Sequence, residues 1–241
     1  MKIMENDSNS IEVGQLWAQI ELMEDQRRFN GLAYPDGQAA FPFKLTGQGF
    51  FPGGDGLWRE DNELSVESSK RIRREGVMFL GNDFGTLRSY ESLRLKGFEN
   101  PITWKNLKSR VRRAKIPPDY AFFTNSVLGL RLGSGTKALD KRDWQNSSQF
   151  AAFCQEFLLF QVEALLPRLI VVLGPNALVS LKAFGVPLSG KGNSRVKLGS
   201  HQTLVHRTTH PYGDFNFSDF RKEVDAAALR LAWDQASSTS S

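Results

Sequence analysis

The chain has 241 residues, 40% of them hydrophobic, which is enough for one sizeable core or for a core with an appendage. No apolar run is long enough to span a bilayer, the start lacks a signal-peptide core, and the single cysteine, Cys154, excludes an internal disulfide and a multi-cysteine metal cluster. The net charge of +5 permits a polyanionic partner without requiring one, and we expect a cytoplasmic protein.

Residues 1–75 vary in composition and hydrophobic pattern, and we interpret them as a helical and loop-rich extension packed on the core. Apolar residues recur at helical spacing within 11–29, which predicts an amphipathic helix. The segment 31–56 is rich in Gly, Pro and Phe and has no period, so it is typical of loops and short strands. Residues 62–75 are predicted to be helical. Nothing in this extension indicates its function.

The stretch 76–85 reads as a buried strand that ends in a small polar loop. Residues 76–80 form an apolar run of strand length, and Asn82 and Asp83 follow between Gly81 and Gly85. Ligands of open α/β sheets bind beyond the carboxyl ends of the strands, which is where this loop falls. Asp83 is therefore either a loop cap, a common role for aspartate in turns, or a catalytic group.

A basic helix is predicted over 103–115. Its apolar residues fall on one face, while Lys108, Arg112 and Lys115 fall on a neighbouring face. Lys105, Arg110 and Arg113 are nearby, and there is no acid among these residues. That face suits contact with phosphates, or it is an ordinary solvated surface. A second strand over 120–123 follows and ends in the polar residues 124–126.

The second half of the chain continues the alternation of helices and strands. Its predicted elements are a long helix before 167 with Cys154 in its core face, a strand over 169–173, a helix over 176–184, a basic glycine loop over 190–195, a strand over 203–208 and a last helix over 216–235. Residues 236–241 are a polar tail that we expect to be disordered.

Strands alternating with helices predict an α/β protein. We expect a three-layer α/β/α sandwich over 76–235, with a central four-stranded, mainly parallel sheet and the N-terminal extension added to it. Three strands end in polar pairs at 82–83, 124–125 and 209–210, and parallel strands bring such ends to one edge of a sheet.

These strand ends resemble the motifs of the uracil-DNA glycosylase superfamily. Residues 81–85 (GNDFG) resemble the family's first motif, which reads GQDPY or GEAPG in other branches, and residues 123–127 (FTNSV) resemble a strand that ends in a base-reading asparagine. Residues 166–177 (LPRLIVVLGPNA) resemble a segment of the iron–sulfur branch, and His210 with Pro211 resembles the closing motif before an intercalating loop. The chain departs from that branch by having one cysteine where a cluster needs four, and by having Phe84 in place of the motif proline.

The resemblance implies a monofunctional DNA glycosylase that flips a base out of single- or double-stranded DNA and excises it by hydrolysis. With one cysteine no cluster can form, and we expect no cofactor, no metal and a monomer. The residues expected to act are Asp83, His210 and Asn82 in catalysis, Asn125, Phe98, Phe84 and Gly85 in base recognition, and Tyr212 and Phe215 in DNA contact. The basic helix adds Lys108, Arg112 and Lys115 to the DNA contacts.

The substrate hypothesis concerns a base with a group on C5. In the uracil-specific branch a tyrosine is understood to exclude such groups, and this chain has Gly85 in its place. The pocket is therefore expected to admit uracil or a C5-modified pyrimidine, such as a hypermodified cytosine of phage DNA, and the latter substrate would imply anti-phage defence in place of DNA repair. Family members with glycine there also act on uracil.

Two other functions fit the same residues. A catalytically inactive nucleic-acid-binding protein of the same fold is favoured by Phe84. A small-molecule nucleosidase fits the polar strand ends and would not need the basic helix. The residues do not indicate which base is excised.

Overall fold

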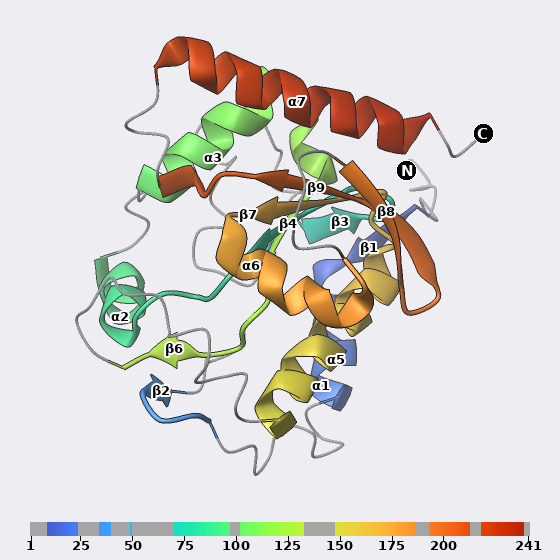
Figure 1. Ribbon diagram of the computed structural model, residues 1–241. Coiled ribbons are helices and arrows are strands. Elements are labelled where there is room, and N and C mark those ends of the chain that lie inside the picture. Colours follow the sequence, from blue (N-terminus) through green and yellow to red (C-terminus); the bar gives the residue numbers. More distant parts are fainter. Residues whose placement is uncertain are drawn as a thin grey trace, which may run out of the picture.

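Figure 1 shows the fold as a computed structural model. The structure describes residues 9–23, 34–39, 49, 70–96, 102–132, 148–186, 193–212 and 218–238. Its centre is a five-stranded, mostly parallel sheet with helices on both faces, which confirms the α/β class. None of the helices within these ranges is long and apolar enough to cross a membrane.

The central sheet has the strand order β5-β4-β7-β9-β8. In its middle, β4 (Val77–Gly81) pairs in parallel with β5 (Ala121–Asn125) and with β7 (Leu169–Leu173). On the other side of β7, β9 (His201–Thr208) is also parallel, and β8 (Asn193–Leu198) pairs with β9 in the antiparallel direction. Every residue of β4 and β7 is buried, as expected for strands covered on both faces.

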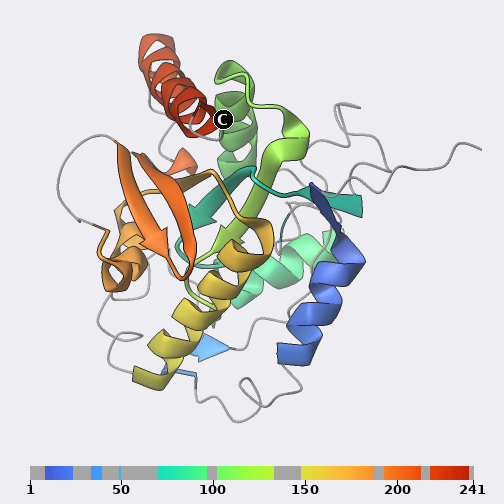
Figure 2. The same ribbon diagram turned by 90° about the vertical axis from the view of Figure 1, so that its right-hand side faces the viewer.

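Alternate side chains of the strands enter two hydrophobic cores. Val77 and Phe79 enter the core formed with α3 (Ile102–Arg113) and α7 (Asp219–Ser237). Met78 and Leu80 enter the core formed with α5 (Ser148–Leu165), α6 (Pro175–Ser180) and α1 (Val13–Met23). Figures 1 and 2 show α3 and α7 on one face of the sheet and α5 and α6 on the other.

Short elements connect the rest of the described chain. They are β1 (Ser10–Glu12), β2 (Gln38–Ala39), β3 (Arg71–Arg73), α2 (Leu87–Lys96), the short 3₁₀ helices η4 (Pro118–Tyr120) and η5 (Leu181–Phe184), and β6 (Leu130–Arg131). β1 pairs antiparallel with β3, and β2 pairs antiparallel with β6. The described parts of residues 1–75 are therefore hydrogen-bonded to each other and to the segment after β5.

Three sequence expectations are wrong. Residues 236 and 237, expected in a disordered tail, continue the helix α7, and Ala236 is 4% exposed in the core formed with α3. The helix expected over 62–75 is a strand at residues 71–73, where Ile72 is 1% exposed and pairs with Ile11 of β1. The loop expected over 190–195 becomes the strand β8 from residue 193, and its buried Val196 and Leu198 alternate with exposed residues. The central sheet therefore has five strands where four were expected.

Candidate functional site

Three strand ends meet at one cavity of about 300 Å³. Asp83 follows β4, Asn125 ends β5 and His210 follows β9, and all three line this cavity. A second cavity of about 390 Å³ also has these three residues in its lining and adds Asn82 and Tyr212. The strands concerned are parallel, so their carboxyl ends meet at one edge of the sheet, as the sequence predicted.

The loop after β4 is fixed to the turn after β5 by main-chain hydrogen bonds. The amide of Ser126 donates to the carbonyl of Gly81 at 3.0 Å, and the amide of Val127 donates to the carbonyl of Asn82 at 2.8 Å. Further along, the amide of Arg131 donates to the carbonyl of Gly85 at 2.9 Å. Gly85 has a φ of +86°, a conformation that glycine adopts without strain.

Gly81 is also required for steric reasons. A Cβ atom at this position would lie 2.1 Å from Oδ1 of Asn125. The missing side chain therefore makes room for the Asn125 amide at the edge of the cavity.

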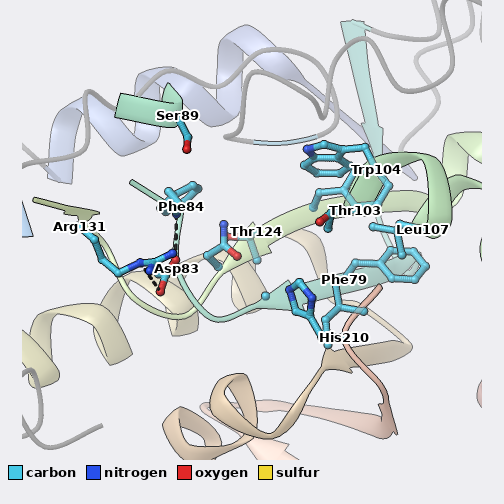
Figure 3. Close-up of a pocket in the computed structure, with 15 residues that line it drawn as sticks. Phe79, Asp83, Phe84, Ser89, Thr103, Trp104, Leu107, Thr124, Arg131 and His210 are labelled. Atoms are coloured by element: carbon cyan, nitrogen blue, oxygen red, sulfur yellow. Dashed lines mark hydrogen bonds and ion pairs between the residues drawn. The ribbon is translucent and has the colours of Figure 1, made fainter. Parts of the chain in front are cut away.

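The carboxylate of Asp83 is held from three sides. Its Oδ1 accepts a hydrogen bond from the amide of Gly85 at 2.9 Å, and its Oδ2 accepts one from Nδ2 of Asn82 at 2.9 Å. Nε of Arg131 lies 3.4 Å from the same Oδ2, in an ion pair whose side chains are 17% and 9% exposed for Arg131 and Asp83. Figure 3 shows this pair on one side of the cavity. Asn82 thus contacts Asp83 and positions it.

Arg131 is a site residue that the sequence did not reveal. It lies in the short strand β6 and lines both cavities. Its partner Asp83 is far away along the chain, and no local motif connects the two. Only the pairing of segments in space brings them together.

The imidazole of His210 has a defined hydrogen-bonding direction. The amide of Tyr212 donates to its Nδ1 at 3.2 Å, so Nδ1 is an acceptor and the neutral ring carries its hydrogen on Nε2. The His210 side chain is exposed and lines both cavities, so a ligand in either cavity can reach its ring. Gly174 has no Cβ atom to crowd this residue, since one built there would lie 3.2 Å from Cβ of His210.

An aromatic wall forms the apolar part of the first cavity. Phe79 and Phe123 stack with their ring centroids 5.3 Å apart, and Trp104 meets Phe123 edge-on at 5.3 Å. Leu107 completes the wall (Figure 3). The sequence predicted Trp104 only as a core residue of its helix, because helical spacing alone does not tell a core face from the wall of a cavity.

The residues predicted for base recognition occupy different places. Asn125 is half-buried and lines the cavity, and its neighbour Thr124 also lines it with a buried hydroxyl that has no hydrogen-bond partner within the described residues. Phe84 is only 1% exposed, yet it contributes to the lining. Phe98 lies outside the described residues.

The three cations predicted to contact phosphates do not form one exposed face. Lys108 is 5% exposed and therefore buried, whereas Arg112 and Lys115 are exposed. Helical spacing placed Lys108 beside Arg112, but spacing does not show which faces of a helix other segments cover. Tyr212 is 59% exposed and lines the second cavity. Phe215 lies outside the described residues.

A buried arginine connects α3 to the end of β9. Nη1 of Arg110 donates to Oγ1 of Thr208 at 2.8 Å and to the carbonyl of Thr209 at 2.9 Å. Since Thr209 precedes His210, these hydrogen bonds fix the start of residues 209–212, which we call the histidine loop.

His206 lies near Arg110 and is buried and neutral. Burial, and secondarily the charge of Arg110, lower its pKa to about 4, although Asp225 opposes this. Its Nδ1–H donates to Oδ1 of Asn193 at 2.8 Å.

Cys154 is a core residue, as predicted. It is 2% exposed, the amide of Leu128 donates to its Sγ at 3.4 Å, and burial raises its pKa to about 12. Within the described ranges, no group of three or more His, Cys, Asp or Glu side chains is arranged to hold a metal ion.

No protein-family model matches the sequence, and no curated protein matches it either. The resemblance to the uracil-DNA glycosylase superfamily therefore rests on the sequence motifs alone.

Proposed function

We propose that the protein is a monofunctional DNA glycosylase that excises uracil or a C5-modified pyrimidine. The observation that carries the proposal is the convergence of Asp83, Asn125 and His210 on one cavity with an aromatic wall. A cavity of about 300 Å³ is at the lower end of the range for small-ligand sites, as suits a single base. The proposal includes the three-layer α/β/α sandwich of this superfamily, with helices covering both faces of the sheet.

Asp83 would act on the sugar. Breaking the N-glycosidic bond leaves the bonding electron pair on the base and positive charge on the sugar, which is oxocarbenium-like in the transition state. A carboxylate stabilises that charge and orients the water that attacks C1′. Asn82, Arg131 and the amide of Gly85 hold Asp83 in place for this, and a carboxylate with these three contacts keeps further acceptor capacity.

His210 and Asn125 would act on the base. The departing pyrimidine gathers negative charge on an oxygen, and the Nε2–H of neutral His210 is a suitable donor to it. Asn125 presents both a donor and an acceptor, so its amide matches the edge of a pyrimidine. Phe79, Phe123 and Trp104 supply the apolar surface that a base needs after it leaves the stack.

Space beside Gly85 supports a substrate with a C5 group. Gly85 lines the cavity, and a Cβ atom built on it would meet no atom within 4 Å. This open volume supports the hypothesis of a hypermodified cytosine, such as that of phage DNA, with uracil as the smaller substrate.

The contacts of Asp83 also favour one rival. A carboxylate that accepts from the amide two residues ahead is a common loop cap, so an inactive DNA-binding protein with the same fold explains the same geometry. Asp83→Asn separates these functions, because an asparagine oxygen still caps the loop but has no charge to stabilise the sugar.

The test is base excision from defined oligonucleotides. Substrates carry uracil, a thymine mispair, 5-hydroxymethylcytosine or its glucosylated form, and alkali-labile abasic sites are measured. We expect cleavage of at least one substrate, a loss of about 10²–10⁴-fold for Asp83→Asn and about 10²–10³-fold for His210→Ala, at a temperature at which circular dichroism shows both variants to be folded. DNA binding without excision would favour the inactive protein, and hydrolysis of free nucleosides alone would favour the nucleosidase.

A further inference from the structure

A polar groove of about 190 Å³ lies between α3 and α7, apart from the cavity described above. It is lined by Lys105, Asn106, Ser109, Arg110, Arg113 and Lys222. Lys105, Arg113 and Lys222 supply positive charge to the groove and Ser109 supplies a hydroxyl, whereas Arg110 is 4% exposed and its guanidinium donates to Thr208 and Thr209. Such a set of donors is suited to the oxygens of a phosphate group.

The acids near the groove are more exposed than the cations they contact. Asp219 lies 3.9 Å from Arg113 and 3.6 Å from Lys222, and Glu223 forms an ion pair with Arg113. The side chains of Asp219 and Glu223 are 85% and 62% exposed, against 31% for Arg113 and 30% for Lys222. Exposed ion pairs are worth at most about 1 kcal/mol, so a phosphate can replace these acids at little cost.

The groove adjoins the cavity along the same helix. Thr103, Trp104 and Leu107 of α3 line the cavity, while Lys105 and Ser109 line the groove. Residues 103–109 span about 9 Å of helix axis. That length matches about three nucleotides of a strand, which rise about 3.4 Å each.

The groove is also attached to the histidine loop. Nδ2 of Asn106 donates to the carbonyl of Pro211 at 2.8 Å, and Arg110 donates to the carbonyl of Thr209. These two hydrogen bonds lie on either side of His210. A ligand in the groove therefore contacts the residues that fix this loop.

We propose that this groove binds the phosphodiester backbone of a nucleic acid, next to the nucleotide whose base enters the cavity. The identity of that nucleotide rests on the proposed glycosylase function, but the backbone site does not. The site differs from the sequence prediction, because Lys108 is buried and the groove takes its cations from two helices.

The experiment measures the binding of an unmodified duplex oligonucleotide across a range of salt concentrations. The test variant combines Lys105→Gln with Lys222→Gln. The matched control combines Lys182→Gln with Lys197→Gln, which removes two positive charges at positions that line neither the groove nor the cavities. A third variant, Arg112→Gln with Lys115→Gly, tests the exposed residues of the predicted basic face.

We expect the groove variant to bind about tenfold or more weakly, and its plot of log K against log salt to be shallower by about 2, since each phosphate contact contributes about 0.9 to the slope. For the control with Lys182 and Lys197 replaced, we expect the loss of affinity and the loss of salt slope each to be at most half of those of the groove variant. Equal slopes for the groove variant and the wild type would overturn the proposal, and so would a loss of slope confined to the Arg112 and Lys115 variant.

The readout also separates this proposal from the glycosylase proposal. Binding of an unmodified duplex needs no excision, so the groove can be tested even if no base is released. If excision occurs, the groove variant should show a raised KM and nearly the wild-type kcat, because its substitutions do not touch the cavity.

Discussion

His206 makes folding stability depend on pH in a predictable direction. Its pKa falls from the ordinary value of 6.5 to about 4, chiefly because the ring is buried and also because Arg110 is close. Between these two values the unfolded chain binds a proton on this residue and the folded protein does not. Stability is therefore fully present above about pH 6.5 and is lost as the pH falls towards 4.

The expected magnitude follows from the same two values. Between the two pKa values, each pH unit changes the free energy of unfolding by about 1.4 kcal/mol. The lowering of the His206 pKa from 6.5 to about 4 therefore limits its total contribution to about 3 kcal/mol. Between pH 7 and pH 5 the unfolded chain takes up nearly one proton more than the folded protein. His206 should therefore cost the protein about 2 kcal/mol over that interval.

The assay is urea unfolding, followed by tryptophan fluorescence, of the wild type and of His206→Gln at pH 7 and pH 5. Carboxylates titrate in both proteins and cancel in the comparison. The free energy of unfolding of the wild type should fall by about 2 kcal/mol more than that of the variant. If both proteins lose the same free energy between pH 7 and pH 5, the reasoning about His206 is refuted.

Three further predictions concern the core and the site. Gly81→Ala should cost about 1–3 kcal/mol in urea unfolding, because its Cβ would displace the Asn125 amide, and should lower the excision that we propose about 10²-fold. A wild-type free energy of unfolding together with wild-type excision would contradict this. Arg131→Gln should lower the free energy of unfolding by about 2 kcal/mol through loss of its pair with Asp83, and a double-mutant cycle with Asp83→Asn that gives no coupling would reject that pairing. Cys154 should resist iodoacetamide at pH 8 and react fully in urea, because its thiol is buried with a pKa near 12; mass spectrometry would reveal any native labelling faster than global unfolding.

The sequence predicted those strands that are buried on both faces. β4 and β7 are continuous apolar runs followed by glycine or a polar loop, and such runs are visible in the residues themselves. β8 was missed because it lies at the sheet edge, where Arg195 and Lys197 alternate with Val196 and Leu198. Its alternation was present in the sequence, but the preceding glycines favoured a loop.

The site was predictable only where a motif carries it. Asp83, Asn125 and His210 each follow a strand, so the rule for parallel sheets was enough to bring them together. Arg131 and the inward contacts of Arg110 were not found, because the partners lie far along the chain and no local spacing encodes such contacts. Helical periodicity does not show whether a cation lies in solvent or donates its hydrogen bonds to groups inside the protein.

The support of the cavity loop has a consequence for protein engineering. Main-chain hydrogen bonds from Ser126, Val127 and Arg131 hold the loop over residues 81–85, and the side chain of Phe84, 1% exposed, packs into the core. The lining positions 89 and 104 lie outside this loop, so randomising them while keeping Gly81, Phe84 and Gly85 should yield folded variants with differently shaped cavities. Such a library would alter the walls of the cavity while the loop that contains Asp83 keeps its position.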